Sequence, residues 1–124
     1  MAVHILVVDE NENTQQEIIE GLKPAGYTAK SVGDAKKASE ILNNERFDLI
    51  ITEIIMPDKD GLELIMEVTS QFPGIKIIAM SGHNEGGMNY LEIARGLGAN
   101  GAFAKPFTIP ELLDAVKKTI NQKN

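Results

Sequence analysis

Five short runs of apolar and β-branched residues recur along the chain, each followed by a longer stretch in which apolar residues have helical spacing. This alternation is typical of repeated βα units around a parallel sheet. The runs are almost continuously hydrophobic, as expected for strands that helices cover on both faces. We therefore predict an α/β fold with a five-stranded, doubly wound parallel sheet. The predicted strands are His4–Val8, Thr28–Val32, Leu49–Thr52, Lys76–Met80 and Gly101–Ala104.

Helices are predicted between these strands from apolar spacing together with start and stop signals. In chain order, they are a helix from about Asn13 to a stop near Pro24 and Gly26, one with Asp34 as its N-cap, one between Asp60–Gly61 and Phe72, one covering roughly Met88–Leu97, and one that follows Pro110 and reaches Ile120.

Length and composition place limits on the kind of protein. A chain of 124 residues with 43% hydrophobic content suits one compact domain, residues 1–124. There is no cysteine, no apolar run long enough for a membrane span and no leader-like segment, so we expect a soluble, cytoplasmic protein. The formal net charge of −6 and the absence of a basic patch argue against direct binding to nucleic acid.

Charged side chains gather where the predicted strands end, and open α/β sheets bind ligands at that edge. Asp9 and Glu10 follow the first strand, Glu53 follows the third, Ser81 the fourth and Lys105 the fifth. The usual winding order would bring the three carboxylates together, with the lysine opposite. A carboxylate at the end of a buried strand is costly unless it has a partner or a function.

Crowded carboxylates are relieved by protonation or by a cation, and oxygen ligands with a few waters suit Mg2+. The pattern therefore predicts a magnesium site. A simpler interpretation is that residues 9–12 are a solvated acidic loop that caps the first helix.

Four segments together resemble the receiver domain of the two-component response regulators: ILVVDEN at 5–11, DLIITEIIMPDKDGLELI at 48–65, IIAMSG at 77–82 and GANGAFAKPF at 98–107. The resemblance covers essentially the whole chain and implies a flavodoxin-like (βα)5 fold. It also implies a phosphoacceptor at position 53, served by a histidine kinase or a phosphotransfer protein. Ser81 would contact the phosphoryl group, Lys105 would pair with it, and the bond to Pro106 would be cis. The implied Mg2+ ligands are Asp9, Glu10, Glu53 and the backbone carbonyl of Ile55.

The chain departs from the family at the centre of this site, because the resemblance calls for aspartate at position 53 and the sequence has glutamate. The additional methylene moves the nucleophilic oxygen by about 1.5 Å. Positional errors near 1 Å can cost about 100-fold in rate, or about 2.7 kcal/mol. We predict that Glu53 blocks phosphotransfer. Its carboxylate could imitate the activated state only weakly, because a phosphoryl group carries nearly two charges.

Two origins of Glu53 are compatible with the sequence. It is either a substitution that imitates the active state or the natural residue of a pseudo-receiver that acts as a protein-interaction module without phosphorylation. The otherwise intact set of Asp9, Glu10, Ser81 and Lys105 favours substitution. The sequence specifies neither the cognate kinase, nor the downstream protein target, nor the oligomeric state.

Two further classes share the fold. A flavodoxin-like cofactor binder is disfavoured, because residues 9–12 present carboxylates where phosphate needs donors. A Mg2+-dependent phosphohydrolase is disfavoured, because so short a chain has little surface for selecting a small substrate. We therefore expect a signalling module that is not an enzyme.

Overall fold

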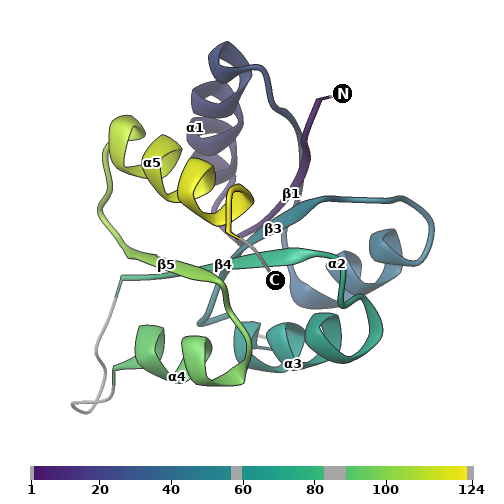
Figure 1. Cartoon of the computed structure of the whole chain (residues 1–124). Coiled ribbons are helices and arrows are strands. Elements are labelled where there is room, and N and C mark those ends of the chain that lie inside the picture. The colour runs from purple at the N-terminus through teal and green to yellow at the C-terminus, as the bar shows by residue number, and fades with distance from the viewer. Residues whose placement is uncertain (1, 57–59, 83–88, 123–124) are drawn as a thin grey trace.

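The computed structural model describes residues 2–56, 60–82 and 89–122. Five parallel strands form one sheet in the order β2-β1-β3-β4-β5, which confirms the predicted doubly wound architecture (Figure 1). This order is that of flavodoxin-like sheets. The strands are β1 (His4–Val8), β2 (Thr28–Val32), β3 (Leu49–Glu53), β4 (Lys76–Ser81) and β5 (Gly101–Ala104). The helices are α1 (Glu12–Leu22), the 3-10 turn η1 (Lys23–Ala25), α2 (Ala35–Leu42), α3 (Gly61–Gln71), α4 (Tyr90–Leu97) and α5 (Ile109–Ile120).

Helices cover both faces of the sheet, with α1 and α5 on one side and α2, α3 and α4 on the other (Figure 1). The central strand β3 is buried along its whole length. Successive residues of a strand point to opposite faces. Leu49 and Ile51 accordingly pack with α1 and α5, whereas Ile50 packs with the other three helices. Burial on both sides explains why the strands read as continuous apolar runs.

Most helix ends lie within a few residues of the predicted positions. The first helix starts at Glu12 because Asn11 is its N-cap and accepts a hydrogen bond from the Thr14 amide. The predicted start of the fourth helix at Met88 lies outside the described residues, and the helix as described begins at Tyr90. Within the described ranges, no helix is both long enough and apolar enough to cross a bilayer.

Two central strands extend one residue further than predicted. Glu53 pairs with Met80 in the register of β3 and β4, and Ser81 pairs with Ala104 in the register of β4 and β5. Both polar residues therefore belong to the sheet itself, so the strand hydrogen bonds fix the position of their backbones.

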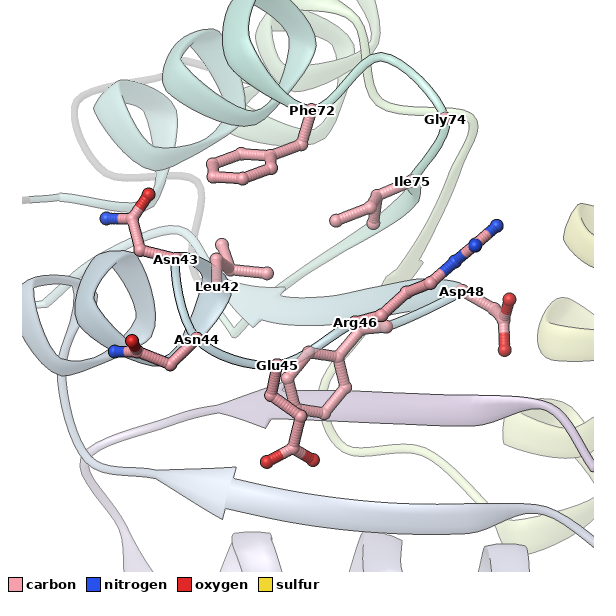
Figure 2. Close-up of a pocket in the computed structure, with 10 residues that line it drawn as sticks. Leu42, Asn43, Asn44, Glu45, Arg46, Asp48, Phe72, Gly74 and Ile75 are labelled. Atoms are coloured by element: carbon pink, nitrogen blue, oxygen red, sulfur yellow. The ribbon is translucent and has the colours of Figure 1, made fainter.

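A hollow of about 430 Å3 opens at the amino ends of β3 and β4, between the ends of α2 and α3 (Figure 2). Its wall contains the apolar side chains of Leu42, Phe47, Phe72 and Ile75. No sequence pattern predicted this hollow. The hollow lies at the amino ends of the strands, whereas the residues selected from the sequence lie at their carboxyl ends. It is therefore at the opposite edge of the sheet from the expected site.

Candidate functional site

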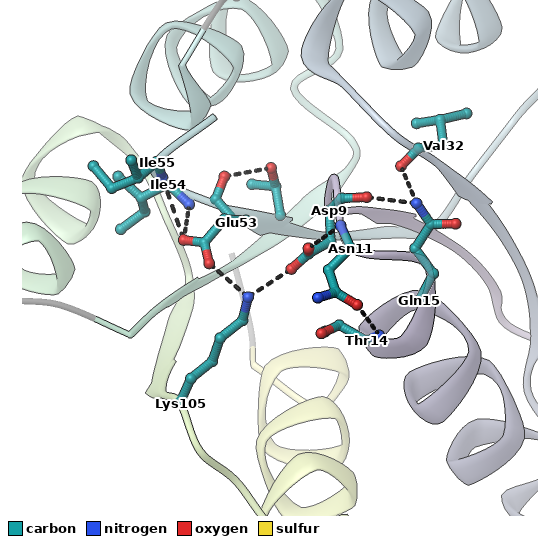
Figure 3. A network of polar contacts seen from close by, with 10 residues as sticks. Asp9, Asn11, Thr14, Gln15, Val32, Glu53, Ile54, Ile55 and Lys105 are labelled. Carbon is teal, nitrogen blue, oxygen red and sulfur yellow. Dashed lines mark hydrogen bonds and ion pairs between the residues drawn. The ribbon is translucent and has the colours of Figure 1, made fainter. Parts of the chain in front are cut away.

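The carboxyl edge of the sheet brings Asp9, Glu53 and Lys105 into contact (Figure 3). Val8 of β1 pairs with Thr52 of β3. The residues that follow them, Asp9 and Glu53, therefore place their carboxylates side by side where the two strands end. The Lys105 ammonium reaches this place from the end of β5. Its Nζ atom lies 2.7 Å from Oδ2 of Asp9 and 2.6 Å from Oε1 of Glu53. Of the four side chains expected at this edge, the structure brings Asp9, Glu53 and Lys105 together.

The three charges are largely shielded from water. Asp9 is 1% exposed and Glu53 is 8% exposed. Two carboxylates and one ammonium give the cluster a formal charge of −1. Burial lowers the pKa of Lys105, but hydrogen bonds to Asp9 and Glu53 raise it by more, so that this pKa lies above its ordinary value of 10.5. Lys105 is therefore charged at neutral pH and serves as the counter-ion of both acids.

The second carboxylate oxygen of Glu53 is held by the backbone that follows it. Oε2 accepts hydrogen bonds from the amide of Ile54 at 2.7 Å and from the amide of Ile55 at 3.2 Å. Ile54 also donates to the carbonyl of Met80. Both oxygens of Glu53 are thus engaged within the chain, one by an ammonium and the other by two amides.

Asp9 is positioned by residues that the sequence analysis did not select. The amide of Asn11 donates to Asp9 Oδ1 at 2.8 Å, and the side-chain amide of Gln15 donates to the backbone carbonyls of Asp9 and Val32 (Figure 3). Asn11 could have been found from the preference for asparagine at helix N-caps. The role of Gln15 depends on tertiary structure and leaves no local sequence signal.

The other selected residues lie around this cluster in different environments. Glu10 is exposed, so the third expected carboxylate does not join the other two. Ser81 is 4% exposed, and its carbonyl accepts a hydrogen bond from the Lys105 amide. The side chain of Ile55 is exposed. The Lys105–Pro106 peptide bond is cis, as the resemblance implied.

The donor chemistry of the cluster suits a hard divalent cation, because carboxylate oxygens are the ligands that Mg2+ prefers. In the arrangement described, however, one oxygen of each acid already accepts a hydrogen bond from Lys105. The described residues include no group of three histidine, cysteine, aspartate or glutamate side chains placed to hold a metal ion. The ligand atoms are therefore of the type that Mg2+ prefers, while the Lys105 ammonium lies between the two buried acids.

A sheet of this winding order, with paired acids and a lysine at its carboxyl edge, defines a receiver-type signalling module. The family model of the response regulator receiver domain matches residues 5–117, and the chain belongs to that family. Receiver domains act in two-component signal transduction.

Relatives of very different length share this domain. Sporulation initiation phosphotransferase F of Bacillus subtilis is 31% identical over 120 residues, which cover 97% of this chain and 95% of that protein. DNA-binding transcriptional regulator NtrC of Azospirillum brasilense is 32% identical, but the match covers only 24% of its length. Among solved structures, chemotaxis response regulator CheY4 of Vibrio cholerae has a TM-score of 0.86 and 25% identity, with 96% of this chain and 99% of that chain covered. The chain thus spans nearly all of some relatives and about a quarter of the length of others.

Proposed function

We propose that this chain is a phosphorelay receiver module that forms a single domain and interacts with a histidine kinase or a phosphotransfer protein. Glu53 occupies the phosphoacceptor position. The observation that carries this proposal is the buried contact of Lys105 with both Asp9 and Glu53 at the carboxyl edge of the sheet. Three chemically matched side chains from three separate strand ends converge there, within a chain that belongs to the receiver family.

In the aspartate form of such a site, the chain's own residues would perform the transfer. An aspartate oxygen at position 53 attacks the donor phosphorus as the bond from phosphorus to the leaving group breaks. Lys105 and Ser81 would then donate hydrogen bonds to the phosphoryl oxygens. Asp9, Glu10 and the backbone carbonyl of Ile55 would hold Mg2+ together with residue 53. When bound, Mg2+ supplies positive charge beside those oxygens.

As the chain stands, Glu53 blocks this reaction. The additional methylene displaces the attacking oxygen by about 1.5 Å. In addition, Oε1 accepts a hydrogen bond from the Lys105 ammonium and Oε2 accepts two from backbone amides, which hold both oxygens in place and make them weaker nucleophiles. The Glu53 carboxylate bound to Lys105 supplies part of the contact that a phosphoryl group would make, and in this way imitates the activated state weakly.

One observation also favours a second function, that of a pseudo-receiver which recognises a partner protein without phosphorylation. The single charge of Lys105 balances one of the two buried negative charges. The amides of Ile54 and Ile55, which together clamp the Glu53 carboxylate, stabilise the remaining negative charge. A site satisfied in this way has no need of a phosphoryl group to order it. The two functions predict different results for Glu53→Asp: a phosphorelay receiver would gain a phosphoryl group, and a pseudo-receiver would stay unmodified.

The test is phosphorylation by acetyl phosphate in the presence of Mg2+, measured by intact mass on the unaltered chain, on Glu53→Asp and on Glu53→Asn. The asparagine variant is the matched control, because it has the shorter side chain but no nucleophilic carboxylate. We expect only Glu53→Asp to gain one phosphoryl group. If Glu53→Asp stays unmodified, the phosphorelay proposal fails and the pseudo-receiver becomes the better account. If the unaltered chain is modified, Glu53 does not block transfer.

A further inference from the structure

The hollow at the amino edge of the sheet has an apolar wall and a polar rim (Figure 2). Leu42 and Phe47 are the buried part of the wall, and Phe72 and Ile75 are half-buried. The volume of about 430 Å3 lies within the range of pockets that enclose small organic ligands. The wall can therefore shield an aromatic ring or a branched alkyl group from water.

The polar side chains of the rim offer mainly acceptors. Asn43 and Asn44 each donate their side-chain amide to a backbone carbonyl of α2, at 3.1 Å and 3.0 Å. Asp48 accepts the amide of His4 through Oδ2 at 2.9 Å. The Oδ1 atoms of these three rim side chains accept no hydrogen bond from the described residues. A ligand that satisfies the rim must therefore donate hydrogen bonds.

Two helix ends give the rim a partial negative potential. Asn43 is the C-cap of α2 and Phe72 is the C-cap of α3, and both residues line the hollow. The aligned backbone dipoles of a helix place about half an elementary negative charge at its C-terminal end. Both ends therefore favour positive charge in the hollow.

The side-chain charges of the rim do not oppose this preference. Glu45 is engaged by the Lys30 ammonium at 2.7 Å. Asp48 and Arg46 carry opposite charges, and Arg46 forms no ion pair among the described residues. The Arg46 side chain is exposed and points away from Leu42 (Figure 2). With the formal charges nearly balanced, the helix ends and the acceptor oxygens decide which ligand fits.

We propose that this hollow binds a primary ammonium that carries an aromatic or branched aliphatic group. The apolar group lies against Phe72 and Ile75, and the ammonium donates to the Oδ1 atoms of the rim. Aromatic ring faces, which Phe47 and Phe72 supply here, also attract a cation. The site lies at the opposite edge of the sheet from position 53, so the inference does not depend on the proposed function.

The test is titration of the unaltered chain with three probes that share a phenylethyl group, followed by backbone amide NMR at neutral pH. The probes are phenethylamine, which is cationic, phenethyl alcohol, which is neutral, and phenylpropionate, which is anionic. We expect phenethylamine to saturate with a dissociation constant of about 1 mM or tighter and to shift the amides of Phe47, Asp48 and Ile75. Phenethyl alcohol should bind about fivefold more weakly or worse, and phenylpropionate should not saturate.

Two variants of the rim test the sign of the charge. Asp48→Asn removes the carboxylate and keeps an oxygen for the His4 amide, so phenethylamine should bind about threefold more weakly or worse. Arg46→Gln removes the competing cation, so binding should become about twofold tighter or better. The matched controls are Asp114→Asn and Lys117→Gln, two exposed positions on α5, which covers the other face of the sheet. Both controls should bind phenethylamine as the unaltered chain does.

A second measurement locates the probe without any variant. Nuclear Overhauser contacts should join the ring protons of phenethylamine to the side chains of Leu42, Phe72 and Ile75. The inference is overturned if phenethyl alcohol or phenylpropionate binds as tightly as phenethylamine, because the hollow would then not select a cation. It is also overturned if none of the probes saturates, if the contacts lie elsewhere, or if either rim variant fails to differ from its control.

Discussion

Gly61 lies directly against the backbone of Glu53, so closely that a Cβ at position 61 would stand 2.1 Å from the Glu53 carbonyl oxygen. The Gly61 amide also donates to the carbonyl of Ile54 at 2.7 Å. Because the obstructing atoms are backbone, they cannot swing away as a flexible side chain would. The start of α3 is thus fixed against the end of β3 by a contact that only glycine permits.

We therefore expect Gly61→Ala to lower the free energy of unfolding by about 1–3 kcal/mol or more, the usual cost of overpacking. The measurement is urea unfolding followed by circular dichroism. Gly74→Ala is the control, because a Cβ there would meet no atom within 4 Å. Equal stability of the two variants would contradict the close contact.

Thr108 caps the helix that follows Lys105 and Pro106. Its hydroxyl accepts a hydrogen bond from the Glu111 amide, and the Glu111 carboxylate accepts one from the Thr108 amide, which completes a capping box. We expect Thr108→Ala to cost about 1 kcal/mol of stability in chemical unfolding. Thr108→Ser retains the hydroxyl and should stay close to the unaltered chain, so a large loss in both variants would mean that the threonine methyl group matters more than the cap.

The sheet could be predicted because burial on both faces leaves a strong signal in sequence. The apolar residues of β3 predict a strand that ends at Thr52, one residue early, because the polar Glu53 interrupts the apolar run. The ladder with β4 extends through Glu53, since backbone pairing does not depend on side-chain polarity. In the same way, the sequence predicts a first helix from about Asn13, whereas the Asn11 cap places its start at Glu12.

The candidate site was predicted in part. The positions of Asp9, Glu53 and Lys105 follow from strand order, which fixes where each strand ends. The clamp on Glu53 Oε2 could not be predicted, because it depends on how the additional methylene folds back toward the Ile54 amide. The exposure of Glu10 depends on the direction of a loop side chain, and local sequence does not determine that direction.

At the amino edge of the sheet, Glu45 links β1 and β2 through side-chain contacts with His4 and Lys30. Its Oε1 atom lies 2.7 Å from the Lys30 ammonium, and its Oε2 atom lies 2.5 Å from His4 Nε2. Hydrogen bonds with Lys30 and, to a smaller extent, with His4 hold the pKa of Glu45 below its ordinary value of 4.5. A depressed folded-state pKa contributes stability above the unfolded value of 4.5, and this contribution is lost as pH falls through the folded pKa.

We expect the unaltered chain to be more stable than Glu45→Gln above pH 4.5 and to lose this advantage in more acidic solution. The effect should be small, because the pair is solvent-accessible. The measurement is the difference in unfolding free energy between the two proteins as pH is lowered from about 5.5 to about 2.5. The control is Glu40→Gln, because Glu40 is exposed and forms no ion pair among the described residues. The difference in unfolding free energy between this variant and the unaltered chain should not change with pH in this way.

The two amides that clamp Glu53 differ in a way that makes the clamp measurable. The Ile54 amide donates both to Glu53 Oε2 and to the Met80 carbonyl, whereas the Ile55 amide donates to Glu53 Oε2. Removal of the carboxylate by Glu53→Ala leaves Ile54 with its partner in the sheet and deprives Ile55 of its acceptor. A hydrogen bond to a charged group is worth about 1.5–3 kcal/mol, so exchange of the Ile55 amide should accelerate about tenfold or more.

Hydrogen exchange followed by amide NMR on the unaltered chain, on Glu53→Ala and on Glu53→Gln checks this expectation. Glu53→Gln has the same length and one side-chain oxygen but no charge, so its Ile55 amide should exchange at an intermediate rate. The Ile54 amide is the internal control and should change little in either variant. Equal acceleration at both positions would indicate general loosening of the β3 end, and no acceleration at Ile55 would mean that Glu53 does not hold this loop.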